Sequence, residues 1–529
     1  MATVRGWRRL VVVLLLLLLL FGMSQAEAQE GILRASSNGS GLAVREYCVF
    51  FNPDWMPWPG SLANATEYPL QNLTSTDLCD SSDVPPGGIE DKIVVVKKGN
   101  CTLMNQTWIA MKNLANALVI ATTSDLTLPS GNQSDYDKLK IPVALISYDD
   151  VLSMEKVLGP NISAKLYSPP LPTMDYSILI IFTIAVMTVA LGGYWSAMEE
   201  GERQSKSVHE SREKSLGRTK TEESLAILTP ITVLFFVAIC SVMIVLLYFF
   251  YEWLVYMVIA IFSVAAALSL YNCLATLVRR IPHCKCSVSC CNRRIEIRLL
   301  LLGMFCVAVA AVWIVFRNED RWVWALHDCL GVAFCLNFMK TLKMPHFKSC
   351  VILLVLLLIY DVFFVFITPL FTPNHKSVMV EVASGSGDGT EKLPVIIRVP
   401  RLVPSVATLC GIPFSVLGFG DIIVPGLLVA YCRRFDVQTN HSSVYFILCT
   451  LAYAVGMVLT FVVLIAMKMA QPALLYLVPC TLITCAVTAW TRKEMRMFWT
   501  GCDYEMMTPV GTASEETIAA LIEPVPENP

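Results

Sequence analysis

Long apolar stretches dominate the chain from about residue 173 onward, whereas the preceding part is much more polar. A helix that crosses roughly 30 Å of hydrocarbon needs about 20 mostly apolar residues. Nine stretches of near that length follow one another, separated by tight turns or polar loops. They lie near residues 176–197, 227–249, 252–277, 299–316, 322–339, 349–370, 403–431, 443–467 and 472–490. The pattern predicts a polytopic, all-α membrane domain of nine transmembrane helices over residues 173–491.

The first 28 residues have the pattern of a secretory signal peptide. Three arginines within the first nine residues precede a leucine-rich run, and Ala26-Glu27-Ala28 fits a small-x-small cleavage site. The apolar run is too short to span a bilayer comfortably. We therefore expect residues 1–28 to be a cleaved signal peptide, and the alternative is an uncleaved membrane anchor.

The polar segment over residues 29–172 has the pattern of a separate α/β domain. Short β-branched runs at 93–96, 118–121 and 143–148 predict strands, and residues 103–117 predict a helix. A strand, a helix and a strand in this order suggest a βαβ unit. Pro169, Pro170 and Pro172 then predict a stiff linker into the membrane domain.

This polar segment also has the marks of an extracytosolic compartment. Its three cysteines, Cys48, Cys79 and Cys101, suit one disulfide and one leftover thiol, and the sequence does not choose the pair. Asn-x-Ser/Thr sequons repeat along it, which predicts a glycosylated lumenal domain. They start at Asn38, Asn64, Asn72, Asn100, Asn105, Asn132 and Asn161.

Basic residues beside the apolar stretches give an independent orientation. Twenty lysines and arginines lie in the connections and tail that a lumenal N-terminus would place in the cytosol, against seven in the lumenal connections. This asymmetry obeys the positive-inside rule. We therefore expect a lumenal N-terminus, a cytosolic tail over residues 492–529, and no glycan on the eighth sequon at Asn440.

Composition narrows the class of protein further. Of 529 residues, 55% are hydrophobic and only 16% are charged, whereas soluble domains carry about a quarter charged residues. The formal net charge of −2 and the lack of a basic patch in the sequence argue against nucleic acid as a partner. The lipid bilayer is the expected surrounding.

Two carboxyl groups lie deep within predicted spans, where a charge costs at least a few kcal/mol. Asp361 is 12 residues from the start of its span at 349, and Asp421 is 10 residues from the end of its span at 431. At 1.5 Å per residue these depths are roughly 18 and 15 Å. Antiparallel helices could therefore bring the two groups together. Two buried carboxyls that share one proton can activate water against an amide carbonyl.

The residues around this pair fit the same chemistry. Gly418 and Gly420 allow another backbone to approach closely, although they are equally compatible with simple helix packing. Tyr360 suits either active-site support or a local packing contact. Pro472, before Ala473 and Leu474, suits the first turn of the last helix.

Three short motifs now point to a family. Together they resemble the YD, GxGD and PAL motifs of signal-peptide-peptidase and presenilin-type intramembrane aspartyl proteases. They are Tyr360-Asp361, Gly418-Phe419-Gly420-Asp421 and Pro472-Ala473-Leu474, on the sixth, seventh and ninth predicted spans. The segments Phe316–Trp322 and Tyr431–Gln438 look like the second signal-peptide-peptidase-like subfamily, closest to its A-type member. The lumenal segment is similar to a protease-associated domain.

The resemblance implies a presenilin-like fold and an activity. Asp361 and Asp421 would be the catalytic pair, and residues 472–474 would border the active site and help to place substrate. Enzymes of this orientation cut type II membrane proteins, typically stubs left after ectodomain shedding, and release an intracellular domain. Two carboxylates and water need no cofactor and no metal.

The resemblance also suggests where the protein works and with what. Tyr504-Glu505-Met506-Met507 fits a tyrosine-based sorting motif that cytosolic adaptors bind. The motif and the subfamily favour membranes of late endosomes and lysosomes, with the plasma membrane as a further location. A homo-oligomer and a monomer both stay open.

Two other functions would also explain buried acids or a large lumenal domain. A proton-coupled transporter buries carboxylates at similar depth, but the chain lacks an inverted repeat of the carrier type. A receptor or sorting adaptor would leave the acids unexplained. The cytosolic cysteines at 284–291 do not have standard zinc spacing, so palmitoylation or free thiols are the better readings, and no metal is assigned.

Overall fold

The computed structural model describes the chain in segments. These are residues 29–37, 43–53, 56–123, 140–170, 175–213, 230–280, 287–290, 293–319, 321–372, 378–379, 382, 391–402, 406–410, 414–439, 442–467 and 471–501. The predicted signal peptide, the sorting motif with Tyr504 and Met507, and the sequons at Asn38, Asn132 and Asn440 lie outside these segments.

The described residues divide into two compact units. The barrel unit comprises residues up to Ser177 together with Pro400–Ser415, and the helical unit comprises Ile178–Val399 and the residues from Val416 onward. The barrel unit ends at Ser177 in its first segment, and the predicted boundary between the polar domain and the membrane domain is at residue 173. The assignment of 400–415 to the barrel unit was not predicted.

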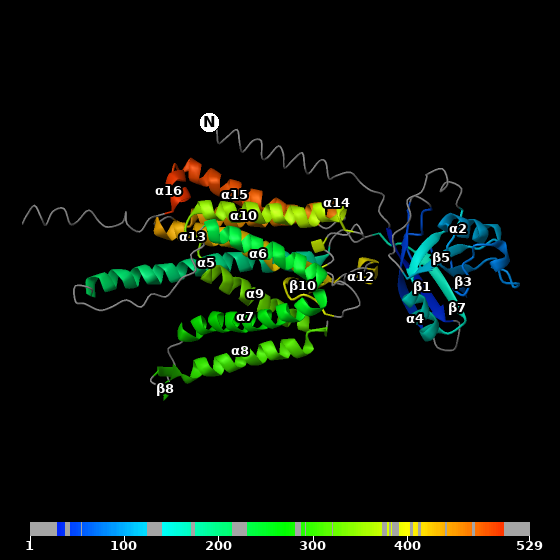
Figure 1. Ribbon diagram of the computed structural model, residues 1–529, viewed down its shortest axis with the longest axis horizontal. Helices are drawn as coiled ribbons and strands as arrows, with labels where there is room; N and C mark the ends of the chain where they lie inside the picture. The colour runs from blue at the N-terminus through cyan, green and yellow to red at the C-terminus, as the bar shows by residue number, and fades with distance from the viewer. Residues whose placement is uncertain are drawn as a thin grey trace, which may run out of the picture. The chain divides into compact units, whose positions relative to one another are not determined.

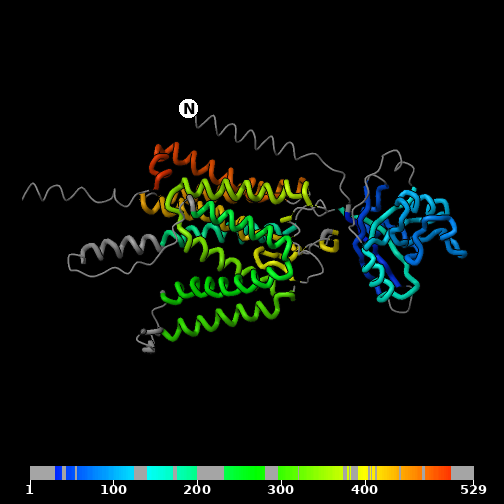
Figure 2. Tube along the Cα trace, viewed as in Figure 1, coloured from blue at the N-terminus to red at the C-terminus, as the bar shows by residue number. Residues whose placement is uncertain are grey.

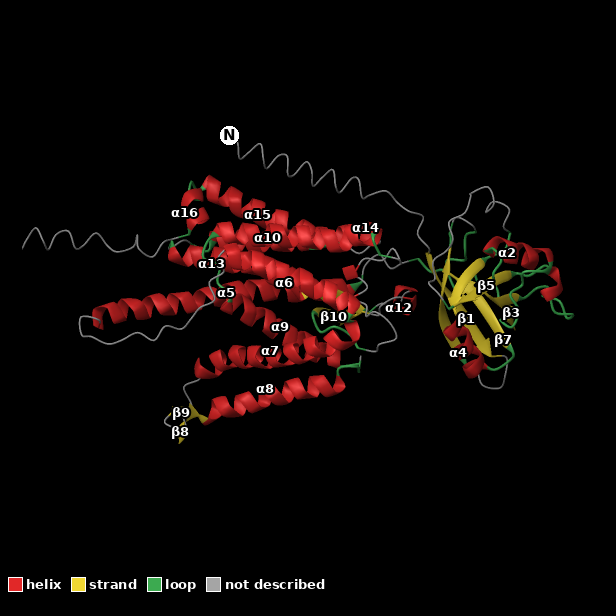
Figure 3. Cartoon of the chain, in the orientation of Figure 1, coloured by secondary structure: helices red, strands yellow, loops and turns green. Residues whose placement is uncertain are grey.

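Seven strands close into the barrel of the first unit (Figures 1 and 3). Their order around the barrel is β1-β2-β6-β5-β4-β3-β7, and β3, β4, β5 and β6 run parallel to one another. The strands are β1 (Gln29–Ser37), β2 (Val44–Phe51), β3 (Tyr68–Leu73), β4 (Ile93–Lys97), β5 (Ala117–Thr122), β6 (Val143–Ser147) and β7 (Ile162–Tyr167).

The predicted βαβ unit is present as β4, α2 (Leu103–Lys112) and β5, with β4 and β5 paired in parallel. The helix ends earlier than the predicted residue 117. Leu114 takes a left-handed conformation at φ 57°, and Ala115 N–H donates to Ala110 C=O. This turn stops the helix in time for β5 to begin at Ala117. A short 3₁₀ helix, η1 (Ser81–Asp83), and the helix α4 (Tyr148–Leu158) complete the barrel unit.

Apolar residues on both faces of the parallel strands form the barrel core. All six residues of β5 are buried, as expected for a parallel strand that is covered on both sides. One face packs into a cluster with Leu33, Val49 and Ile146, and the other into a cluster with Leu78 and Ile89. The continuous apolar run of β5 is the pattern that predicted it.

Two disulfides cross-link the barrel unit, and they overturn the predicted cysteine pairing. Cys79 pairs with Cys101, and Cys48 pairs with Cys410, 362 residues further along the chain. The expectation of one disulfide and one leftover thiol was wrong because it counted only residues 29–172. Cys410 belongs to the predicted span 403–431, and a cysteine within a membrane span was not counted as a partner for a lumenal cysteine.

The helical unit consists mainly of long helices that run alongside one another (Figure 2). Helix α7 packs against α8 and α9, whereas α13 packs against α9, α10, α14 and α15. The helices are α5 (Tyr176–Glu213), α6 (Pro230–Phe249), α7 (Tyr251–Arg280), α8 (Ile297–Phe316), α9 (Val323–Thr341), α10 (Phe347–Val362), α13 (Phe419–Gln438), α14 (Val444–Met467), α15 (Leu474–Thr491) and α16 (Met495–Thr500).

Seven stretches among the described helices are long and apolar enough to cross a membrane. They lie in α5, α6, α7, α8, α10 with its continuation to Leu370, α14 and α15. The other two predicted spans also form helices, α9 and α13. These two carry charged residues, among them Asp328 in α9 and Arg434 in α13, which lower their apolar character. The chain is therefore a multi-pass membrane protein, and nine spans remain a prediction.

The predicted seventh span has the wrong beginning. Helix α13 starts at Phe419 rather than at residue 403. Before it lie the five-residue helix α12 (Val406–Cys410) and the strand β11 (Phe414–Gly418), which forms a two-stranded sheet with β10 (Ile396–Pro400). A second small sheet joins β8 (Ser287–Cys290) and β9 (Arg293–Glu296).

Candidate active site

Asp361 lies at the C-terminal end of α10, two residues before a π-helix begins at Phe363. The side chain is buried, and residues Phe363–Ile367 continue as the π-helix η2 before the 3₁₀ turn η3 (Thr368–Leu370). Single π turns within helices are frequent at functional sites. The uniformly apolar sequence after Asp361 gave no sign of this change.

Asp421 lies in the first turn of α13, directly after the strand β11. Gly418 is the residue before the helix, with extended backbone at φ −65° and ψ 140°. The Gly418-Phe419-Gly420-Asp421 motif is therefore the junction of a strand and a helix. The side chain of Asp421 is half-buried, whereas that of Asp361 is 8% exposed.

The helix boundaries revise the two estimated depths. Asp361 is 14 residues (361 − 347) from the start of α10, and Asp421 is 17 residues (438 − 421) from the end of α13. These separations correspond to roughly 21 and 26 Å along the helices. The two depths differ by about one helical turn, which is more than with the predicted boundaries, and a meeting at similar depth stays a prediction.

The three motifs converge on this pair of carboxyl groups. The two groups lie close enough for the charge of one to act on the other. The backbone N–H of Leu474 donates a hydrogen bond to the Asp361 carboxylate, which joins the Pro-Ala-Leu motif to the acid. Within the described part of the chain, Oδ2 of Asp361 has no hydrogen-bond partner. One oxygen of this buried carboxyl is thus left without a protein partner among the described residues.

Helices α14 and α15 pack next to the segments that carry Asp421 and Leu474. The Tyr453 hydroxyl of α14 donates to the Asp421 backbone carbonyl at 3.3 Å. Gly456 lies one turn further along α14, where an added Cβ would come within 3.2 Å of the Leu477 Cα atom. The two helices therefore pack with their backbones close together, directly beside the segment that supplies Leu474.

The two glycines of the motif play parts that differ from the predicted close approach of another backbone. A Cβ added at Gly418 would lie 3.4 Å from Oδ2 of Asp421 itself. A Cβ added at Gly420 would meet nothing within 4 Å, and this residue is exposed. A Cβ at Gly418 would thus be in ordinary contact with the acid, and Gly420 borders open space next to it. Tyr360 packs against Phe364 at a tilted angle, with ring centroids 4.8 Å apart.

Helix α9 holds the strand β10 through two buried polar side chains. Nε2 of His327 is 2.9 Å from the Ile396 carbonyl oxygen, and the Arg398 backbone N–H donates to Oδ1 of Asp328 at 3.0 Å. Phe419 stacks on the His327 ring, and its own backbone N–H donates to the Val395 carbonyl oxygen. β10 is therefore fixed both to α9 and to the junction that carries Asp421. The sequence analysis missed Asp328, although it is an acid within a predicted span.

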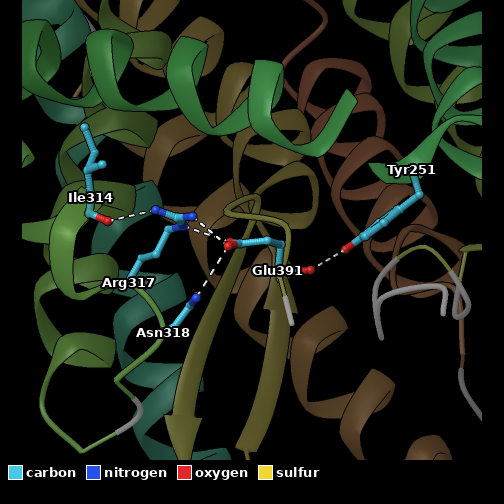
Figure 4. Close-up of polar contacts among 5 residues, drawn as sticks. All are labelled: Tyr251, Ile314, Arg317, Asn318 and Glu391. Atoms are coloured by element: carbon cyan, nitrogen blue, oxygen red, sulfur yellow. Dashed lines mark hydrogen bonds and ion pairs between the residues drawn. The ribbon is translucent and has the colours of Figure 1, made fainter. Parts of the chain in front are cut away.

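A second contact fixes the chain just before β10 (Figure 4). Arg317 donates two hydrogen bonds to the Glu391 carboxylate, at 2.8 and 2.6 Å, and the Tyr251 hydroxyl donates to the Glu391 backbone carbonyl. Asn318 makes a longer contact with the same carboxylate. The start of α7 and the end of α8 thus meet the segment that leads into β10 at Glu391.

One group of thiols in the helical unit has the spacing of a metal site. The sulfur atoms of Cys432, Cys449 and Cys485 lie within 4.8 Å of one another, and all three side chains are buried. Cys432 is 11 residues after Asp421 on α13, or roughly 16 Å along the helix. Buried thiols also pack as small apolar groups, and we assign these three no role in the chemistry of the acid pair.

Comparison with known proteins places the chain in a family. A signal peptide peptidase family model matches residues 220–505, more than half of the chain, and a PA domain model matches residues 65–154. The chain is 55% identical to signal peptide peptidase-like 2A of Homo sapiens, over 92% of this chain and 93% of the relative. It is 46% identical to signal peptide peptidase-like 2B of Homo sapiens, over 92% of this chain and 83% of the relative.

A third relative is more distant. Signal peptide peptidase-like 2C of Mus musculus is 39% identical, over 90% of this chain and 74% of the relative. The matched family region contains all three motifs that meet at Asp361 and Asp421. The chain therefore belongs to the signal peptide peptidase family, as an intramembrane protease of the signal peptide peptidase-like 2 type.

Proposed function

We propose that the protein is an aspartyl protease in which Asp361 and Asp421 together hydrolyse a peptide bond within the membrane. The observation that carries this proposal is the meeting of the two carboxyl groups, one of them bonded to the Leu474 backbone. Two acids in a water-poor interior do not both hold a charge readily, so one proton stays with the pair. General acid and general base are then present in one site.

The two groups divide the work of hydrolysis. The ionised carboxyl takes a proton from water as the water oxygen attacks the carbonyl carbon, and the protonated carboxyl donates to the carbonyl oxygen. The resulting tetrahedral species collapses when a proton reaches the leaving nitrogen. Open space beside Gly420 supports access of an extended substrate to Asp421. A helical substrate must unwind first, because an intact helix shields its own amides.

The orientation of the chain suggests the class of substrate. With nine spans and a lumenal N-terminus, the segment between α10 and β10 faces the lumen, and α10 runs from cytosol to lumen. We propose type II membrane proteins as substrates, in the form of stubs left after ectodomain shedding, with release of their intracellular domains. The tyrosine-based motif at 504–507 supports placement in late endosomal and lysosomal membranes.

The decisive experiment compares the wild-type chain with Asp361→Asn and Asp421→Ala in cells that express a tagged type II stub. We expect both variants to accumulate normally, carry the same glycans and release no intracellular fragment. A loss of roughly 10⁴-fold or more is the scale reported when a triad acid-base group is removed in hydrolases. Fragment release at the wild-type rate from either variant would remove that acid from catalysis. A proton flux that depends on the acids would then favour the transporter.

A further inference from the structure

The connection between β10 and β11 is fastened to the barrel unit, although the two strands lead into and out of the helical unit. Its described part, α12, has only five residues, and a helix of that length does not hold itself together in isolation. Val406 is 2% exposed and packs with Ile32, Ala65 and Tyr167 of the barrel unit. The connection thus takes its shape from the barrel.

Two further contacts complete the attachment. The Ser415 hydroxyl lies 2.7 Å from that of Ser177, within the barrel unit. Cys410, the last residue of α12, is joined to Cys48 of β2, with 4.9 Å between the Cα atoms. The disulfide is the one covalent contact among the described residues that holds this connection, and it closes a segment of chain 362 residues long.

The attachment lies close to Asp421 along the chain. Asp421 follows Cys410 by 11 residues (421 − 410), and five of the intervening residues form β11. β11 pairs with β10 and passes into α13 at Gly418 without an intervening loop. Because β11 is hydrogen-bonded to β10 and has no loop after it, a shift at the start of β11 is passed on to its end at Gly418. A displaced connection would therefore move the first turn of α13, which carries Asp421.

We propose that the Cys48–Cys410 disulfide positions Asp421 by fixing the β10–β11 connection to the barrel, so that opening this bond slows proteolysis while both units stay folded. The proposal rests on the proposed function of Asp421. The second disulfide is a matched control, because Cys79–Cys101 joins two parts of the barrel that are separated by 22 residues and includes nothing from the connection.

A first experiment tests the covalent link in the full chain. A site for a sequence-specific protease is inserted in the Ser384–Gly389 stretch, between the two cysteines. After cleavage of the wild-type chain, we expect the two fragments to migrate together without reductant and to separate with it. Cys48→Ser and Cys410→Ser fragments should separate in both conditions. Separation of the wild-type fragments without reductant would overturn the proposal.

A second experiment measures proteolysis of a type II stub by purified full chains in detergent. We expect Cys48→Ser, Cys410→Ser and the double variant to share one reduction of kcat, roughly tenfold or more, because small misplacements of reacting groups are costly. KM for the stub should change much less. The Cys79→Ser/Cys101→Ser chain should keep wild-type kcat. Wild-type kcat in the double variant, or an equal loss in the control chain, would overturn the proposal.

Reduction of the folded wild-type chain with dithiothreitol tests the effect of the disulfide on kcat without relying on the folding of a cysteine variant. Dithiothreitol supplies two electrons and two protons to each disulfide and leaves as a cyclic disulfide, so that Cys48 and Cys410 become thiols. We expect reduction to lower kcat of the wild type and of the Cys79→Ser/Cys101→Ser chain, with recovery on reoxidation. An unchanged kcat after verified reduction of Cys48–Cys410 would overturn the proposal. An Asp421→Ala chain with wild-type activity would instead defeat the proposed function.

Discussion

Glu391 shows what one side chain does for the segment that precedes β10. Its two carboxylate oxygens accept hydrogen bonds from Nε and Nη2 of Arg317. Only 12% of the Glu391 side chain is exposed. Hydrogen bonding from Arg317 lowers the pKa of Glu391 below its ordinary value. A charge-assisted pair of this geometry contributes about 1.5 kcal/mol or more.

Replacing Glu391 by Gln should lower the melting temperature of the purified protein at neutral pH. Because the pKa of Glu391 is lower in the folded chain, the stabilisation is present above the ordinary value of 4.5 and is lost as the pH falls through the folded value. We therefore expect the difference between wild type and Glu391→Gln to be constant from pH 7 to about 5 and to shrink below about 4. A difference that vanished already at pH 5–6 would contradict this account. Arg317→Ala should have no added effect in the Glu391→Gln background.

Asp328 provides a second test on a single residue. Asp328→Ala removes the acceptor for the Arg398 backbone N–H, whereas Asp328→Asn keeps an oxygen in the same place. We expect Ala to reduce kcat for stub cleavage by roughly tenfold, because β10 loses an anchor beside the Asp421 junction, and Asn to restore most of it. Equal activity of Ala and wild type would show that α9 does not position β10. Equal loss in both variants would instead assign a role to the negative charge.

The sequence predicted the acids at 361 and 421 because each is isolated in an apolar run that also carries a recognisable motif. It missed Asp328 because that acid lies only six residues after the start of its predicted span at 322, next to His327, and carries no recognisable motif. The Leu474 contact was out of reach for a different reason. The hydrogen bond comes from a backbone N–H, which every residue but proline has, so the identity of the side chain at 474 does not predict it.

At the scale of elements, α14 and α15 depend on one another through Gly456. An alanine Cβ there would lie 3.2 Å from Leu477 Cα and 3.3 Å from the Tyr476 carbonyl oxygen, and neither backbone atom can turn aside. We expect Gly456→Ala to destabilise the protein by about 1–3 kcal/mol and to reduce cleavage, because α15 carries Leu474.

Gly303 of α8 is the matched control for this change. A Cβ there would meet only Tyr271 ring atoms, at 3.9 Å or more, so Gly303→Ala should leave stability unchanged or slightly raised. Melting temperature and stub cleavage of both variants check the prediction. It fails if Gly456→Ala is as stable and active as Gly303→Ala.

The boundaries of β4, β5 and β6 were predicted to within one residue, whereas α2 ends five residues before its predicted end and the elements before α13 were not predicted. Strands β4, β5 and β6 stood out as short apolar runs between polar turns. The run over residues 403–431 instead combines α12, β11 and thirteen of the twenty residues of α13. Hydropathy does not separate a short apolar strand from the helix that continues it. The start of α13 is set by the extended backbone at Gly418 and by pairing with β10, which is a contact between distant residues.

At the scale of the whole molecule, the predicted orientation makes a simple test possible. Among the described sequons, Asn64, Asn100, Asn105 and Asn161 are exposed, whereas Asn72 is half-buried and donates to Glu155. We expect Asn→Gln at each exposed position to remove one endoglycosidase-sensitive mass step, and Asn440→Gln to remove none. A step lost on changing Asn440 would reverse the proposed topology.

Helix α13 has a consequence for how the chain is made. Fifteen of its twenty residues are buried within the protein, including Arg434 and Asp436. Such a segment gains little from contact with lipid, and its charges make transfer into hydrocarbon unfavourable. Two of the four helices that pack against it, α9 and α10, are synthesised before it, and the other two, α14 and α15, are synthesised after it. A ribosome must extend the chain past residue 491 before all four neighbours of the segment that carries Asp421 are present, so nascent chains truncated earlier should leave part of α13 exposed to quality-control factors.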